Sequence, residues 1–273
     1  MSEYRRQKRR ALGQHFLVSA GILGKIVREI DPQPGDLVIE IGAGRGALTF
    51  ALAEKAGRVV AIEKDTRLVS LLKKNARPNV EIVAADVLDL DFREIARTRA
   101  SQGRPVKVAG NLPYAISSPL LFKVFHERQA LDKGIFLVQK EVAERVCASP
   151  GSKNFAPISI ILQMAFTAEP RLGVHPGSFS PPPKVESTVI VMKKRPHLLF
   201  PAADEDAFLD FLRQSFRQRR KTLFNNLIAS GRPAAGVREA LAALGLKNTI
   251  RPEQTTAAQF FALFTILASP DKT

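Results

Sequence analysis

Short apolar runs alternate with helix-like segments along the first two-thirds of the chain. A strand that is covered on both faces reads as a continuous apolar stretch. Five such runs predict buried strands, at residues 37–41, 59–62, 80–83, 106–109 and 135–138. One segment with apolar residues at helical spacing, 19–30, precedes the first strand, and similar segments lie between the strands. The alternation predicts an α/β fold with a doubly wound parallel sheet.

The later part of the chain has a different rhythm. One strand is expected within 158–166 and another at 187–192, and together they would add an antiparallel hairpin to the end of the sheet. Beyond about residue 200 the pattern predicts only helices, with apolar faces near 208–216, 223–228, 241–244 and 260–267. We therefore expect an N-terminal arm at 1–18, an α/β domain at 19–195 and a helical domain at 196–273.

Charge and cysteine content narrow the class of protein. The chain has 41 Lys and Arg residues against 26 Asp and Glu, a net charge of +15, which favours a polyanionic partner such as nucleic acid over a membrane. Its single cysteine, Cys147, excludes an intramolecular disulfide and argues against a metal cluster. No secretory signal or long apolar span is visible. We expect a cytoplasmic protein without a metal or a membrane partner.

A glycine loop follows the first strand and opens the next helix. Gly42 and Gly44 allow a ligand to approach the backbone there, and Glu63, at the end of the next strand, can bind both hydroxyls of a ribose. The spacing fits a nicotinamide dinucleotide as well as S-adenosylmethionine. Glu40 favours the second ligand, because a carboxylate repels a pyrophosphate and tolerates ammonium and sulfonium charges. Asp86, at the third strand's end, could accept from the adenine amine.

The most informative run is Asn111-Leu112-Pro113-Tyr114, at the end of the fourth strand. Open α/β sheets place their ligands at that edge. The Asn111 side-chain oxygen and the Leu112 carbonyl can both accept from an exocyclic amine. Pro113 stiffens the turn, and Tyr114 offers a flat face on which a base can stack. The run therefore predicts a site for an amino-bearing base.

Five motifs in this order resemble the small-subunit rRNA adenine N6,N6-dimethyltransferases, the kasugamycin-sensitivity methylases. The resemblance extends from about Gln7 to the last predicted helix. The motifs are Gly13-Gln-His-Phe-Leu17, Glu40-Ile-Gly-Ala-Gly-Arg-Gly46, Asn111-Leu-Pro-Tyr-Ala-Ile-Ser-Ser-Pro119, Phe179-Ser-Pro-Pro-Pro-Lys-Val185 and Arg219-Arg-Lys-Thr-Leu-Phe-Asn225.

The resemblance implies a Rossmann-like class I S-adenosylmethionine methyltransferase domain with a helical C-terminal domain. It implies methyl transfer from S-adenosylmethionine to N6 of two adjacent adenines in the 3′-terminal hairpin of 16S rRNA, with S-adenosylhomocysteine as product, during small-subunit biogenesis. It adds His15 and Leu17 to the cofactor residues Glu40, Gly42, Gly44, Glu63, Asp86 and Asn111, although many members have Asn where this chain has His15.

The resemblance also extends the acceptor site. The target base must leave its stack, and Phe179 would face it opposite Tyr114. No strong base is required, because the sulfonium is a strong electrophile and alignment supplies most of the rate. Further contacts to the RNA phosphates are expected from a basic cluster in the helical domain, which consists of Arg217, Arg219, Arg220 and Lys221.

Three other functions compete with this interpretation. A 23S rRNA adenine methylase of the macrolide-resistance type has the same chemistry, but the Arg219-Arg-Lys-Thr-Leu run favours the small-subunit family. A non-catalytic RNA-binding assembly factor would be expected to have a damaged glycine loop or pocket, and none is apparent. A nicotinamide oxidoreductase would leave the run from Asn111 to Tyr114 without a role.

Overall fold

The chain forms two compact units in a computed structural model that describes residues 15–99, 103–199 and 205–268. The first unit comprises residues 1–143 and 166–195, and the second comprises 144–165 and 196–273. The sequence-based division shares the boundary after residue 195 but assigns 144–165 to the α/β domain. That segment ends in the helix α8 (Pro157–Ala165), which packs against α9 (Glu205–Ser215) in the second unit.

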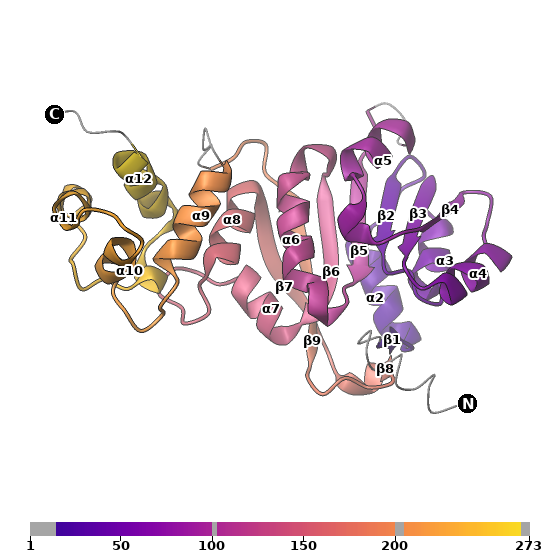
Figure 1. Cartoon of the computed structure of the whole chain (residues 1–273). Coiled ribbons are helices and arrows are strands. Elements are labelled where there is room, and N and C mark those ends of the chain that lie inside the picture. The colour runs from indigo at the N-terminus through magenta and orange to yellow at the C-terminus, as the bar shows by residue number, and fades with distance from the viewer. Residues whose placement is uncertain (1–14, 100–102, 200–204, 269–273) are drawn as a thin grey trace. The chain divides into compact units, whose positions relative to one another are not determined.

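A seven-stranded sheet forms the centre of the first unit (Figure 1). The parallel strands are β2 (Leu37–Ile41), β3 (Arg58–Glu63), β4 (Val80–Ala84), β5 (Val106–Asn111) and β6 (Lys133–Gln139). Two antiparallel strands, β9 (Ser187–Lys194) and β7 (Phe166–Val174), complete the order β4-β3-β2-β5-β6-β9-β7. The predicted parallel sheet with a late antiparallel pair is confirmed.

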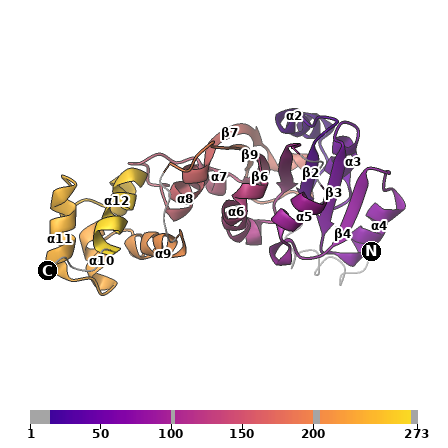
Figure 2. The same cartoon turned by 90° about the horizontal axis from the view of Figure 1, so that it is seen from above.

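Helices cover both faces of this sheet, which explains why its central strands β2, β5 and β6 are mostly apolar and buried. Figure 2 shows α2 (Ala20–Ile30) and α3 (Ala47–Ala53) on one side, and α5 (Phe92–Arg99) and α6 (Ser117–His126) on the other. The helix α4 (Thr66–Lys74) links β3 to β4, and α7 (Lys140–Val146) follows β6. Ile26 and Ile30 of α2 pack with Leu52 of α3 and with strand residues in one buried cluster.

The prediction of a strand within 158–166 is wrong. Residues Pro157–Ala165 form α8, and the strand β7 begins only at Phe166. Seven of the nine residues of α8 are buried, so the helix is apolar on most sides and its amphipathic period is weak. Periodicity alone does not separate a fully buried helix from a buried strand.

A separate two-stranded sheet joins distant parts of the first unit. The strand β1 (Phe16–Leu17) pairs antiparallel with β8 (Phe179–Ser180), with Phe16 opposite Ser180 and Leu17 opposite Phe179. The pairing brings the segment before α2 against the segment before the proline run. Two of the resembling motifs therefore meet in space although the chain separates them widely.

The second unit is helical, as predicted for the region beyond residue 200. It contains α8, α9, α10 (Leu223–Ala229), α11 (Ala234–Ala243) and α12 (Ala257–Ala268). Its core includes the aromatic rings of Phe208 and Phe211 in α9 and Phe260 in α12. The rings of Phe211 and Phe260 meet edge to face, with centroids 6.5 Å apart.

Two features are absent from the described residues. No helix there is both long and apolar enough to cross a lipid bilayer. The same residues contain no group of three or more His, Cys, Asp or Glu side chains that could hold a metal ion.

Candidate active site

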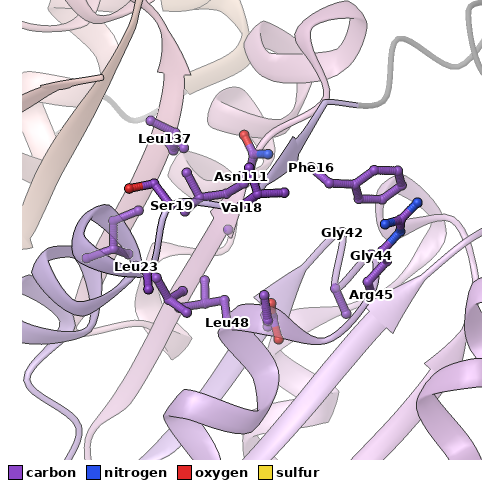
Figure 3. A pocket seen from close by; sticks show the side chains of 17 residues that line it. Phe16, Val18, Ser19, Leu23, Gly42, Gly44, Arg45, Leu48, Asn111 and Leu137 are labelled. Carbon is purple, nitrogen blue, oxygen red and sulfur yellow. The ribbon is translucent and has the colours of Figure 1, made fainter. Parts of the chain in front are cut away.

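A cavity of about 350 Å³ opens at the carboxyl ends of β2 and β5 (Figure 3). This is the edge at which open α/β sheets bind ligands. Its walls come from β1 and the start of α2, the glycine loop and the start of α3, and the ends of the central strands. The lining residues are Phe16, Leu17, Val18, Ser19, Ala20, Leu23, Ile26, Glu40, Gly42, Ala43, Gly44, Arg45, Ala47, Leu48, Gly110, Asn111 and Leu137.

The glycine loop adopts a backbone that other residues rarely accept. Gly42 and Gly44 have φ values of 70° and 60°, in the left-handed region. The Gly42 amide donates to the Ile62 carbonyl at 2.9 Å, and the Gly44 amide donates to Glu63 Oε2 at 2.9 Å. A Cβ at Gly44 would lie 3.2 Å from the Phe16 ring. The loop thus needs glycine both for its conformation and for the space that β1 occupies above it.

Glu40 is a buried carboxyl group on the cavity wall. Its side chain is 2% exposed in β2, and its Oε2 has no hydrogen-bond partner among the described residues. Burial raises the pKa of Glu40 from its ordinary 4.5 to about 7; the Thr49 side chain opposes this rise, and the Glu63 carboxylate adds to it. A buried anion with an unsatisfied oxygen is costly, so a cation in the cavity would stabilise the charged form.

The amide of Asn111 is held by the backbone of the N-terminal segment. Its Nδ2 donates to the carbonyl of His15 at 2.8 Å, which leaves Oδ1 available as an acceptor. The following turn is anchored as well, because the Leu112 amide donates to Leu137 O at 3.0 Å and the Pro113 carbonyl accepts from Ser117 Oγ at 3.1 Å. The predicted acceptor group is therefore fixed in orientation.

Tyr114 begins a short 3₁₀ turn, Tyr114–Ile116, directly after this run. Its hydroxyl lies 2.9 Å from Ser187 Oγ, and its ring centroid lies 5.5 Å from that of His15. The ring is partly buried, and burial raises the pKa of the phenol while the Ser187 hydroxyl lowers it. Tyr114 is thus a partly exposed ring beside the Asn111 amide.

Some predicted site residues lie outside the cavity wall. The His15 ring bonds through Nδ1 to Pro181 O at 2.8 Å, and both oxygens of Glu63 accept backbone amides. Asp86 caps the turn Val87–Asp89 and pairs with Lys64 at 2.6 Å, which lowers its pKa. For these three residues, contact with a cofactor stays a prediction.

Phe179 lies in the core. It is 3% exposed and packs in the same buried cluster as Ile26 and Ile30 of α2. Its ring therefore presents no free face in this structure. The predicted stacking of Phe179 on a base stays a prediction, and it would require the ring to leave that packing.

The predicted RNA-binding residues share one loop of the second unit, between α9 and α10. Arg217, Arg219, Arg220 and Lys221 are all exposed. The loop is held from below by Asn226, which is 3% exposed. Asn226 Oδ1 accepts from the Gln218 amide at 2.9 Å, and Nδ2 donates to the carbonyls of Gln218 and Thr222. Residues 1–14 of the arm predicted at 1–18 lie outside the described residues.

Several cavity residues escaped the sequence analysis. Leu137 of β6 lies opposite Asn111 at the same sheet edge, and Ser19 is the N-cap of the strongly amphipathic helix α2. The strand pattern and the helix-start pattern could therefore have indicated these two residues. Arg45 and Phe16 stand in two of the quoted motifs, but neither motif indicated that their side chains meet. The Arg45 guanidinium lies 4.8 Å from the Phe16 ring centre (Figure 3), a contact that depends on the pairing of β1 with β8.

Comparison with known proteins identifies close sequence relatives. The family model described as "Ribosomal RNA adenine dimethylase" matches residues 5–269. A ribosomal RNA small subunit methyltransferase A from Geobacter sulfurreducens is 41% identical over 260 residues, which cover 93% of each chain. A protein of the same name from Xanthomonas campestris pv. campestris is 38% identical and covers 96% of this chain and 97% of its own.

Solved structures agree with this fold. A dimethyladenosine transferase from Plasmodium falciparum superposes with a TM-score of 0.76 at 26% identity, covering 91% of this chain and 96% of its own. A 23S rRNA methyltransferase, ErmE, superposes with a TM-score of 0.68 at 24% identity, covering 93% of this chain and 100% of its own. The second likeness shows the fold alone. The fold is that of class I methyltransferases with added C-terminal helices.

Proposed function

The chain belongs to the ribosomal RNA adenine dimethylase family, and from that premise we propose that it dimethylates N6 of two adjacent adenines in the 3′-terminal hairpin of 16S rRNA. The methyl donor is S-adenosylmethionine, and S-adenosylhomocysteine is released. The target is presented in a small ribosomal subunit or its precursor. The observation that carries the proposal is the Asn111 amide, which the His15 carbonyl orients beside a cavity lined by the buried Glu40 carboxyl group, whose Oε2 has no partner among the described residues.

The cavity suits a donor with cationic and amino-acid character. Glu40 provides a buried carboxyl group with one oxygen, Oε2, that has no hydrogen-bond partner among the described residues, and the methionine ammonium and sulfonium would supply positive charge. Gly42 and Gly44 let the donor approach the backbone, and Leu17 covers it from β1. The adenosine end would extend toward Glu63 for the ribose hydroxyls, with Asp86 and His15 as further polar contacts.

Catalysis needs alignment more than acid or base strength. The N6 lone pair of adenine is delocalised into the ring. Acceptance of its hydrogens by Asn111 Oδ1 and the Leu112 carbonyl favours a pyramidal, more nucleophilic amine. N6 forms a bond to the methyl carbon as the carbon–sulfur bond breaks, and the sulfur keeps the electron pair. The proton released from N6 passes to solvent, and a second donor repeats the step.

The acceptor side must hold a base that has left its stack. Tyr114 would replace part of the lost stacking, a contribution of about 1–3 kcal/mol per base. Phe179 would supply the opposite face only if its buried ring turned outward. The exposed loop with Arg217, Arg219, Arg220 and Lys221 would bind phosphates of the surrounding RNA.

The competing functions have less support. The relatives named as small-subunit methyltransferases match nearly the whole chain at about 40% identity, whereas the 23S rRNA methyltransferase matches at 24% and informs only the fold. A non-catalytic assembly factor does not need an oriented Asn111 amide next to an open cavity.

The decisive experiment is transfer of a labelled methyl group to isolated 30S and 50S precursor subunits, followed by mapping of the modified nucleotides. We expect label only in 16S rRNA, as N6,N6-dimethyladenine at adjacent positions. Asn111→Ala should abolish transfer while subunit binding persists, and the exposed Asn248→Ala serves as its matched control. Label confined to 23S rRNA, or equal loss of binding and transfer in Asn111→Ala, would contradict the proposal.

A further inference from the structure

Stacking of a base on Tyr114 requires that its ring be held in one orientation. Tyr114 stands in a single 3₁₀ turn after Pro113, and its ring is partly exposed. A tyrosine with two free side-chain torsions loses entropy when a ligand immobilises it, so prior fixation strengthens binding. The hydroxyl contact with Ser187, at 2.9 Å, bridges parts of the chain that lie far apart in sequence.

Ser187 is a rigid anchor. It is the first residue of β9, and its backbone lies between two neighbouring strands, opposite Gln139 of β6 and Val174 of β7. Its side chain is only 1% exposed, so the hydroxyl has little freedom to turn toward solvent. A buried residue that is paired on both sides within the sheet thus contacts the hydroxyl of a ring that belongs to a short turn.

A second contact limits the same ring from another side. The His15 ring centroid lies 5.5 Å from that of Tyr114, with the planes inclined by 30°. His15 also supplies the carbonyl that orients Asn111. The Asn111 amide contacts the His15 carbonyl, and the Tyr114 ring contacts the His15 ring and the Ser187 hydroxyl. Such supporting contacts pre-organise a site.

We propose that Ser187 is a positioning residue of the acceptor site, whose hydroxyl holds the Tyr114 phenol so that the ring presents its face to the adenine beside Asn111. Ser187 touches neither the base nor the donor, and it acts only through Tyr114. The inference rests on the proposed function, because it assigns to Tyr114 the role of stacking platform.

The first test is a double-mutant cycle on methyl transfer to 30S subunits. Ser187→Ala and Tyr114→Phe each remove one end of the contact while the aromatic ring remains. We expect each to lower kcat/KM for the subunit about three- to tenfold, the range for one lost hydrogen bond, without changing KM for the donor. The double variant should lose no more than either single variant. The neighbouring Thr188→Ala, on the opposite face of β9, should behave as the wild type.

The second test reads Tyr114 directly. The chain has two tyrosines and no tryptophan, so Tyr4→Phe leaves Tyr114 as the only phenol. Its titration is followed by the ultraviolet absorbance of tyrosinate after rapid jumps to alkaline pH. The Ser187 hydroxyl lowers the pKa of this phenol, so Ser187→Ala should raise that pKa, and Thr188→Ala should leave it unchanged.

The outcomes separate the two proposals. Wild-type protein that transfers no methyl group to 30S subunits refutes the proposed function, whatever the tyrosine titration gives. If the wild type is active, the positioning role is refuted by wild-type kcat/KM in Ser187→Ala, by additive losses in the double variant, or by an unchanged Tyr114 pKa. An equal loss of activity in Thr188→Ala would also refute it, because a general disturbance of β9 would then explain the effect.

Discussion

Replacement of Glu40 by glutamine should make the free protein more stable and its donor binding weaker. The carboxyl group is buried, and its pKa of about 7 exceeds the ordinary 4.5 because burial disfavours the charge. Below the ordinary pKa of 4.5, Glu40 keeps its proton in both the folded and the unfolded chain, and its ionisation does not contribute to the free energy of unfolding. Above about pH 7 both lose it, and the folded state then carries a penalty of roughly 3 kcal/mol.

The assay is denaturant unfolding of the donor-free protein at two pH values. Glutamine removes the ionisation, so Glu40→Gln should gain about 2–3 kcal/mol more, relative to wild type, at about pH 8 than at about pH 5. Comparison between the two pH values cancels any constant effect of burying the amide. The exposed Glu239→Gln is the matched control and should show no such difference. A gain that is equal at both pH values would show that Glu40 does not carry the penalty.

Donor binding supplies the second half of this prediction. A cationic donor favours ionised Glu40, so binding below about pH 7 must release a proton. Affinity for S-adenosylmethionine should therefore fall as the pH drops below about 7, by up to about tenfold per pH unit. In Glu40→Gln the affinity should be lower and independent of pH over this range. Calorimetry in buffers of different ionisation enthalpy measures the released proton, and its absence in the wild type would refute the linkage.

Three further predictions concern other parts of the chain. Gly44→Ala should destabilise the protein by about 1–2 kcal/mol and weaken donor binding, because a Cβ there meets the Phe16 ring at 3.2 Å in a backbone with φ of 60°. Thermal melting and calorimetry test this. The control is Gly236→Ala in α11, where a Cβ meets open space, and it should instead stabilise the protein by up to about 1 kcal/mol. Asn226→Ala should lower stability by about 1–3 kcal/mol, since the part-buried hydrogen bonds between Asn226 and the loop backbone are lost. It should also weaken 30S binding in a filter assay, and unchanged binding would show that the loop needs no such support. Arg220→Ala should reduce the slope of log affinity against log salt by about one between about 50 and 200 mM, and an unaltered slope would exclude a phosphate contact.

Local patterns were sufficient for most of the first unit. The five parallel strands were predicted because a buried strand needs only a short apolar run, and β2 was found at its predicted bounds. Asn111 and Glu40 were recognised because polar groups at strand ends stand out against that background. The strand expected at 158–166 failed because burial on most sides weakens the helical period of α8.

Contacts between distant segments were beyond such patterns. Nothing in the residues around Phe16 indicates a partner near Ser180, nor does Tyr114 indicate Ser187. The same limit applies to Phe179, whose motif suggests an exposed ring but whose environment is the core under α2. These placements depend on the assembled sheet, and no local propensity encodes them.

The pairing of β1 with β8 has a consequence for the order in which the protein becomes competent during translation. Phe16 and Leu17 leave the ribosome early, but Phe179 and Ser180, which hold them in register, follow more than 160 residues later. Until then the nascent chain contains Asn111, but the His15 carbonyl that orients the Asn111 amide is not yet held in place. A methyl donor would thus find its complete wall only after nearly the whole α/β unit has been synthesised.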